Sequence, residues 1–244
     1  MMHLHEALDT NHIALLARYL GVDQPYDEVL ALMHDLHDQV SKNVLPSHLL
    51  LLEHRPVITI TRSHQSKSIL TSTDAIQKSG IDLCVADRGG DATFHGPGQL
   101  VGYPIIKLSD RHYLDVAWYV RTLEYALLDA MHELFVTHAQ LIPGFTGIWI
   151  KTKNDTRLTF KKLIAIGVGI KDGASKHGFA LNIDIDHTHY TSHIIPCGLK
   201  DRGVITLSEY FSSQSLEMPE RSDIVQVVSQ NLARAFSLNL VWRA

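Results

Sequence analysis

Cysteine is scarce in this chain. Of its 244 residues only Cys84 and Cys197 are cysteines, and they lie far apart in the sequence. Two distant thiols make neither a disulfide framework nor a four-ligand zinc site. We therefore expect a protein with reduced thiols and a cytoplasmic location.

Long apolar runs are missing as well. Residues 49–52 and 163–170 are apolar, but both runs are much shorter than the about 20 residues of a membrane-spanning helix, so we expect buried strands there. Residues 1–6 contain no apolar signal region. The sequence therefore predicts neither insertion into a membrane nor export.

Positive charge is not in excess. Lysine and arginine number 22 against 26 aspartates and glutamates, a net charge of −4, which argues against a general nucleic-acid binder. Sixteen histidines raise the question of a metal site, and the pairs His34/His37 and His187/His189 have helix-like and strand-like spacing. No cysteine or carboxylate cluster in the sequence completes a set of ligands. We expect scattered surface histidines, with no metal and no cofactor.

The size and apolar content suit one domain. A chain of 244 residues that is 45% hydrophobic buries a full core. Residues 1–12 are weakly specified and are expected to be loosely ordered, which leaves 13–240 as the domain. No internal repeat, low-complexity tract or linker divides it.

Strand and helix patterns alternate along the chain. Helices are expected to begin near Pro25, after Asp115 and near Pro219, because apolar residues then recur every three or four positions. Strands are expected at 13–19, 48–53, 57–61, 83–86, 100–106, 163–168 and 179–185, with a hairpin from 148 that turns at Asn154-Asp155. Polar and apolar residues alternate in several of these strands, which favours an antiparallel or mixed sheet. The predicted fold class is α/β (α+β): a single domain with a mixed, mostly antiparallel sheet packed by helices.

One stretch has an unusual composition. Residues 87–100 read Asp-Arg-Gly-Gly-Asp-Ala-Thr-Phe-His-Gly-Pro-Gly-Gln-Leu, with four glycines and a proline between two strand-like runs. Glycine allows positive φ and a close approach of the backbone to a ligand. Arg88 offers a fork of donors to a carboxylate or phosphate, and His95 is expected to exchange a proton near neutral pH. A plain glycine-rich connection is the alternative.

This stretch resembles the signature of the lipoyl(octanoyl) transferases, Arg-Gly-Gly-x-x-Thr-(Phe/Tyr)-His-Gly-Pro-Gly-Gln-Leu. Residues 51–57, Leu-Leu-Glu-His-Arg-Pro-Val, also resemble that family. The related lipoate ligases would have an acidic residue and Gly-Asn at 96–99, where this chain has Gly-Pro-Gly-Gln. The resemblance implies a biotin/lipoate-protein-ligase-like fold. It also implies an acyl pocket lined by three segments: Arg88, Gly89, Gly90, Asp91, Ala92, Thr93, Phe94 and His95; then Ala165, Ile166 and Gly167; then Gly178, Phe179 and Ala180.

Two further motifs resemble the catalytic pair of the family. Cys197 lies in a Pro-Cys-Gly turn, and Lys162 precedes the run Leu-Ile-Ala-Ile-Gly. A nucleophilic cysteine needs a cation beside it to be a thiolate at neutral pH. The resemblance implies that the side chains of Lys162 and Cys197 meet in the folded site. Cys84 lies in an apolar strand run and is expected to be inert, and neighbouring Lys161 is expected to face the other side of its strand.

The resemblance implies an acyltransferase. It implies that octanoyl passes from octanoyl-acyl carrier protein to Cys197, and then to a lysine of lipoyl domains. These acceptors are the E2 subunits of 2-oxoacid dehydrogenases and the glycine cleavage H protein. Two alternatives stay open: an adenylating lipoate or biotin ligase, and a non-catalytic module that binds lipoyl domains.

Overall fold

The computed structural model describes residues 13–61, 68–108, 112–154, 157–195 and 203–243. In chain order its strands and helices are β1 (Ala14–Tyr19), α1 (Tyr26–Ser41), β2 (Ser47–Leu52), β3 (Val57–Thr61), α2 (Thr73–Lys78), β4 (Asp82–Ala86), β5 (Thr93–His95), β6 (Gln99–Ile105), α3 (Val116–Glu133), β7 (Ala139–Ile142), β8 (Phe145–Asn154), β9 (Arg157–Lys171), β10 (Ala174–Asn182), α4 (Thr188–Thr191), α5 (Leu207–Gln214), α6 (Arg221–Ala235) and β11 (Asn239–Trp242).

The strands form two sheets. The larger has eight strands in the order β11-β1-β2-β6-β10-β9-β8-β7, and the smaller has the order β4-β3-β5. In the large sheet β1 is parallel to both β2 and β11, and the other neighbours are antiparallel. The mixed, mostly antiparallel sheet predicted from the sequence is therefore confirmed.

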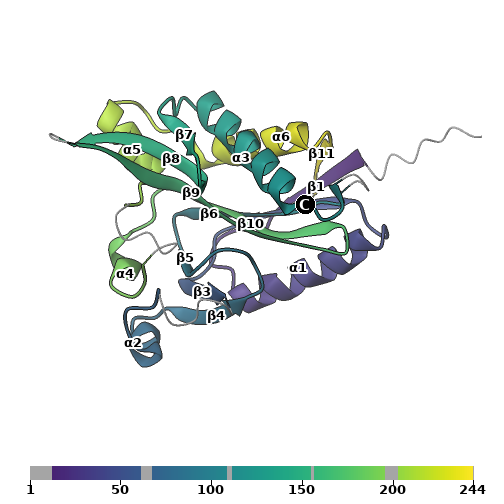
Figure 1. Ribbon diagram of the computed structural model, residues 1–244, viewed down its shortest axis with the longest axis horizontal. Coiled ribbons are helices and arrows are strands. Elements are labelled where there is room, and N and C mark those ends of the chain that lie inside the picture. Colours follow the sequence, from purple (N-terminus) through teal and green to yellow (C-terminus); the bar gives the residue numbers. More distant parts are fainter. Residues whose placement is uncertain (1–12, 62–67, 109–111, 155–156, 196–202, 244) are drawn as a thin grey trace, which may run out of the picture.

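Helices cover both faces of the large sheet. Figure 1 shows α3 and α6 on one side of it and α1 on the other. Every residue of β2 is buried, because successive side chains alternate between the two covered faces. Leu49 and Leu51 pack with the α3 and α6 side, whereas Leu50 and Leu52 pack with α1. The unbroken run of leucines thus reflects a strand buried on both faces.

The helix starts agree with the sequence signals. Helix α1 begins directly after Pro25 and carries two acidic residues in its first turn. Their negative charge stabilises the helix because its N-terminal end is the positive end of the helix dipole. Asp115 caps α3, because its carboxylate accepts a hydrogen bond from the backbone N–H of Trp118 at 2.8 Å. Helix α6 begins at Arg221, two residues after Pro219.

Other parts of the expected arrangement need correction. The small sheet was not expected as a separate unit, and the strand expected at 179–185 is β10, which begins at Ala174. Strands β5, β7 and β11 and helices α4 and α5, all of them short, were not expected from the sequence. No helix among the described residues is long and apolar enough to cross a membrane. Residues 87–92 connect β4 to β5 within the small sheet and contact β9 of the large one, and the site lies there.

Candidate active site

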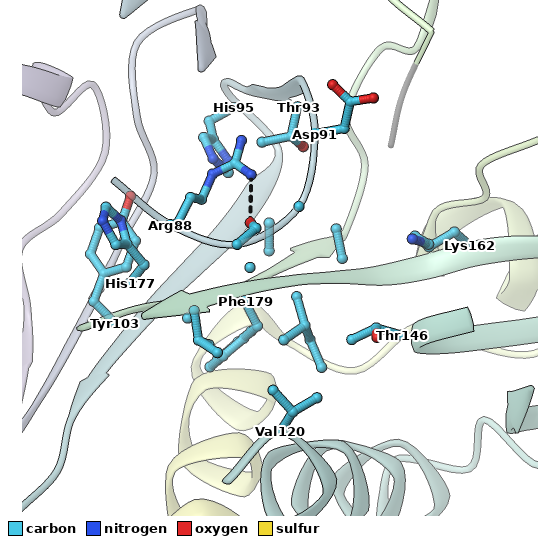
Figure 2. Close-up of a pocket in the computed structure, with 18 of the residues that line it drawn as sticks. Arg88, Asp91, Thr93, His95, Tyr103, Val120, Thr146, Lys162, His177 and Phe179 are labelled. Carbon is cyan, nitrogen blue, oxygen red and sulfur yellow. Dashed lines mark hydrogen bonds between the residues drawn. The ribbon is translucent and has the colours of Figure 1, made fainter. Parts of the chain in front are cut away.

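A cavity of about 440 Å³ lies where the glycine-rich loop meets the large sheet. Its walls come from the loop, strands β9 and β10, the N-terminal part of α3, the turn that leads into β8, and single residues of α1 and β6. Figure 2 shows Lys162 at one end of this pocket, with His95, Arg88, Tyr103 and His177 toward the other. The lining residues are Tyr26, Arg88, Gly89, Gly90, Asp91, Thr93, His95, Tyr103, Val116, Val120, Gly144, Phe145, Thr146, Lys162, Ala165, Ile166, Gly167, Val168, His177, Gly178, Phe179 and Ala180.

The glycines let the loop lie directly on strand β9. The backbone N–H of Gly89 donates to the carbonyl of Val168 at 2.8 Å. A Cβ on Gly167 would come within 2.9 Å of the Gly89 oxygen, closer than real Cβ contacts allow. Gly90 has φ +91°, a conformation that L side chains rarely adopt. Glycine is needed at these positions because any side chain would keep the loop from lying this close to β9.

Arg88 fastens the loop to the small sheet. Its guanidinium donates to the side-chain oxygen of Thr59 at 2.7 Å and to the Thr59 carbonyl at 3.2 Å. A third bond reaches the carbonyl of Gly89 at 3.1 Å. The sequence analysis expected these donors to meet a carboxylate or phosphate, but these bonds give Arg88 a part in shaping the loop as well.

Two of the expected lining residues face away from the cavity. Ala92 and Phe94 are buried in a separate cluster of the small sheet, with Ile58 and Ile76 among its members. Side chains alternate along an extended segment, so Asp91, Thr93 and His95 line the cavity, as residues 88–90 do, and the two side chains between them do not. The expectation that all of residues 88–95 line the pocket is therefore wrong for Ala92 and Phe94.

Lys162 is a nearly buried cation at one end of the cavity, with 8% of its surface exposed. Its Nζ lies 4.7 Å from the centroid of the Trp149 ring, within cation–π distance. Its backbone N–H donates to Gly203 at 2.9 Å, and its carbonyl accepts from Ile205 at 3.0 Å. Lys161 is half-buried and does not line the cavity.

Cys197 lies outside the described residues, so its expected contact with Lys162 stays a prediction. The chain on both sides of residues 196–202 is fixed. Gly203 is bonded to Lys162, and the backbone N–H of Ile195 donates to the carbonyl of Ser68 at 2.8 Å.

Cys84 has the environment of an inert thiol. It is partly buried in β4 and does not line the cavity. Burial raises the pKa of its thiol, and the nearby carboxylates of Asp82 and Asp27 raise it further. This environment disfavours the thiolate that a nucleophile needs.

His95 does not have the proton-exchange behaviour expected from the sequence. It is buried, and desolvation, with a contribution from neighbouring His54, lowers the pKa of His95 to about 3. Burial likewise lowers the pKa of His54 to about 4. Both rings are therefore neutral near pH 7, and the expectation of a proton exchanged near neutral pH is wrong.

The sequence analysis missed several lining residues. Tyr26 begins α1, Tyr103 lies in β6, and Val116 and Val120 face the cavity from the first turns of α3. Nothing in their local sequence distinguishes them from core residues. His177 directly precedes the predicted segment 178–180 and has φ +57°, which is uncommon for a histidine.

Asp87 joins two histidines beside the cavity. Its Oδ1 lies 2.7 Å from Nε2 of His177 and 3.4 Å from Nε2 of His34, and the three possible ligand atoms lie within 4.8 Å of one another. Asp87 thus brings a carboxylate to two histidines, which was not expected from the sequence. The ammonium of Lys176 also bonds this carboxylate, and the bond from His177, with Lys176, lowers the pKa of Asp87. These partners satisfy the carboxylate without an ion, and we assign no metal to this group.

Comparison with known proteins gives one result for the sequence and one for the fold. Residues 25–233 match the family described as Lipoyl protein ligase A/B catalytic domain. A protein of Clostridium kluyveri named Octanoyltransferase is 37% identical over 216 residues, covering 88% of this chain and 86% of that protein. Another Octanoyltransferase, from Caldicellulosiruptor bescii, is 37% identical over 228 residues, covering 91% and 92%.

Among solved structures, a bi-partite lipoate protein ligase from Thermoplasma acidophilum, described with its E2 lipoyl domain, superposes with a TM-score of 0.69. Its sequence is 14% identical, and the match covers 95% of this chain and 87% of that one. At this identity the likeness shows the fold, and it confirms the ligase-like fold expected from the sequence.

Proposed function

Since this chain belongs to the lipoyl protein ligase A/B catalytic domain family, we propose that it moves octanoyl from octanoyl-acyl carrier protein to a lysine of lipoyl domains. It is a transferase, and octanoyl transfer in lipoylation is the activity of the relatives that match almost all of the chain. The donor, the target lysine and a covalent intermediate on Cys197 are the parts that we add.

The observation that carries the proposal is the placement of Lys162. A cation with 8% exposure stands at one end of a cavity whose apolar lining includes Val120, Ile166 and Phe179. Such walls suit a medium-length acyl chain, and the cation suits a reacting group held at the mouth. Gly203, the first described residue after Cys197, is bonded to the backbone of Lys162.

In the first half of the reaction Cys197 becomes acylated. The thiolate, favoured by the Lys162 ammonium, attacks the thioester carbonyl of the donor. The new carbon–sulfur bond forms, the bond to the pantetheine sulfur breaks, and the leaving thiolate takes a proton from Lys162. Backbone N–H groups near Cys197 and in the glycine-rich loop stabilise the oxyanion that forms on the way.

In the second half the acyl group moves to the acceptor. The neutral amine of the target lysine attacks the acyl-cysteine, a carbon–nitrogen bond forms, and the bond to the Cys197 sulfur breaks. Lys162, neutral after the first half, takes the amine proton and returns to its charged form. The cycle therefore needs neither ATP nor a metal.

The proposed acceptors are the lipoyl domains of 2-oxoacid dehydrogenase E2 subunits and the glycine cleavage H protein. Their support is that a ligase of the same fold is described with its E2 lipoyl domain. A cytoplasmic location, residues 13–240 as the catalytic domain, and loose order in residues 1–12 stay predictions.

The deciding experiment runs the two halves separately. Mixed with octanoyl-acyl carrier protein and no ATP, the protein should gain one octanoyl group by intact mass spectrometry, released by hydroxylamine as a thioester is. Added apo lipoyl domain should then receive that group on its lysine, and initial rates should follow ping-pong kinetics.

Cys84→Ser is the matched control for Cys197→Ser. The first variant should keep the adduct and the second should lose it. Transfer that requires ATP and free octanoate would indicate an adenylating ligase, and a stable complex with neither adduct nor transfer would indicate a binding module. Transfer that proceeds unchanged in Cys197→Ala would overturn the covalent mechanism.

A further inference from the structure

The cavity ends in polar side chains that a saturated octanoyl chain cannot use. Tyr26, His95 and Tyr103 all line it, and we call them the polar end of the cavity. The rings of Tyr26 and His95 are nearly parallel, 6.5 Å apart, and His54 lies 5.2 to 5.9 Å from all three rings. In Figure 2 Tyr103 is at the opposite end of the pocket from Lys162.

The hydrogen-bond partners of His54 fix the direction of the Tyr103 hydroxyl. The Nδ1 of His54 lies 3.0 Å from the backbone carbonyl of Gln24, which can only accept, so Nδ1 carries the proton. Since burial holds this ring neutral, its Nε2 is an acceptor. Tyr103 therefore donates its hydroxyl hydrogen to Nε2 at 2.9 Å, and only its oxygen lone pairs can face the cavity.

A chain of amides fixes the tautomer of His95 in the same way. The side-chain nitrogen of Asn182 donates to the carbonyl of Ile205 at 3.4 Å, which leaves its oxygen to accept from Gln99 at 2.9 Å. The other end of the Gln99 amide is then its oxygen, 2.7 Å from Nδ1 of His95. His95 must donate from Nδ1, so its Nε2 is an unprotonated acceptor.

Tyr26 supplies a hydroxyl that is not paired within the protein. Its side chain is 5% exposed and lines the cavity, and across the described parts of the chain its hydroxyl has no hydrogen-bond partner. Burial raises the pKa of Tyr26 to about 12, so the hydroxyl stays protonated. Because Tyr26 lines the cavity, a ligand group held there would supply the hydrogen bond that the protein does not.

The polar end therefore offers acceptors at His95 and Tyr103 and a donor–acceptor at Tyr26. A group that matches this set is small, uncharged and carries a hydrogen-bond donor. We propose that the enzyme also transfers medium-chain acyl groups that carry a hydroxyl at the end remote from the thioester. The inference rests on the proposed function, and the hydroxyl takes no part in the bonds that form and break.

The test compares octanoyl and ω-hydroxyoctanoyl, each loaded on acyl carrier protein. A wholly apolar end would lower kcat/KM for the hydroxylated donor on the order of tenfold to a hundredfold, because a buried hydroxyl would lose its hydrogen bonds to water. We expect the wild-type values for the two donors to agree within about threefold. Tyr26→Phe should lower the ratio of hydroxylated to plain donor by about tenfold, the effect of one lost hydrogen bond in a buried site.

Tyr119→Phe is the control. Tyr119 is equally buried, but its hydroxyl donates to the carbonyl of Pro104 and does not line the cavity, so this variant should keep the wild-type ratio. A wild-type preference of tenfold or more for plain octanoyl would overturn the proposal while leaving octanoyl transfer intact.

A binding measurement decides the matter even without turnover. Calorimetry on Cys197→Ser with each donor should give equal affinities. Tenfold weaker binding of the hydroxylated donor would overturn the inference. Absence of transfer from either donor in the wild type would count against the proposed function instead.

Discussion

Lys162 is the residue on which the proposed chemistry depends most directly. Removal of its ammonium should raise the pH at which Cys197 reacts and slow acyl transfer on the order of a hundredfold or more, since a positioned base is lost. The measurement is the rate of iodoacetamide alkylation against pH for Lys162→Ala. In a Cys84→Ser background, Cys197 is the only cysteine left in the sequence, so the alkylation rate measures that thiol alone.

Lys161→Ala is the neighbouring control. Lys161 is half-buried beside Gly203 and outside the cavity wall, so its loss should leave the profile in place. Coincident profiles for Lys162→Ala and the wild type would show that Lys162 does not activate the thiol.

At the scale of residues, sequence motifs predicted those site residues that a short, local pattern identifies. The loop glycines and Lys162 were identified because their types and order are unusual. Tyr26 and Tyr103 were not, because a tyrosine in a helix or strand is read as core, and only the fold brings the two beside His95. The neutral state of His95 was also beyond the sequence, since it follows from burial under distant elements.

At the scale of elements, the close packing of β6 against β10 depends on a glycine. A Cβ at Gly178 would lie 2.0 Å from the carbonyl oxygen of Gly102 and 2.6 Å from Pro104. Gly178→Ala should therefore force the strands apart, lower the free energy of unfolding by about 2 kcal/mol or more, and distort the cavity wall. Urea unfolding measures the loss.

Gly203→Ala serves as the comparison for that measurement. A Cβ there would meet only the side chain of Lys161, at 3.6 Å or more. Its unfolding midpoint should stay near that of the wild type. Equal midpoints for Gly178→Ala and Gly203→Ala would contradict the packing argument.

Helices and strands were predicted correctly where the periodic pattern of apolar residues extended over many positions. The start signals and periodicity of α1 and α3 and the hairpin of β8 and β9 were clear in the sequence. Helix α5 is short, although Thr206 and Glu209 form a capping box that would have indicated its start. Strands β7 and β11 have four residues each, too few for periodicity to show.

At the scale of the whole molecule, the buried histidines make stability depend on pH. Burial lowers the pKa of His54 to about 4 and of His95 to about 3, and it lowers those of His48 and His177 too. The unfolded chain binds more protons than the folded one below about pH 6.5, so this stability is complete above that pH and is lost as pH falls.

We expect the free energy of unfolding to decrease by on the order of 2 to 4 kcal/mol between about pH 7.5 and pH 5. Asp87 does not contribute in this window, because the lowered pKa of its carboxyl places its loss at more acidic pH. Urea midpoints at the two pH values test this, and His54→Gln should weaken the dependence. Exposed His138→Gln should not. A pH-independent midpoint would contradict the burial of neutral histidines.

The fold class of the whole molecule was predictable, but the long-range contacts that assemble the site were not. Composition and alternation indicated a mixed α/β fold, and the large sheet agrees. The contact of the glycine-rich loop with β9 joins Gly89 to Val168, and nothing local in either segment specifies that partner. Separation of the small sheet likewise follows from pairings that periodicity does not encode.

The pairing of β1 with β11 sets an order in time for synthesis of this protein. Ala14 lies opposite Asn239, so the edge of β1 pairs with residues that the ribosome adds 225 positions later (239 − 14). At typical elongation rates that edge waits about 10 s or longer for its partner. Until then it offers open N–H and C=O groups to any other strand. A nascent chain that stalls before β11 is made would therefore expose an adhesive edge, and emergence of β11 from the ribosome is the event that covers it.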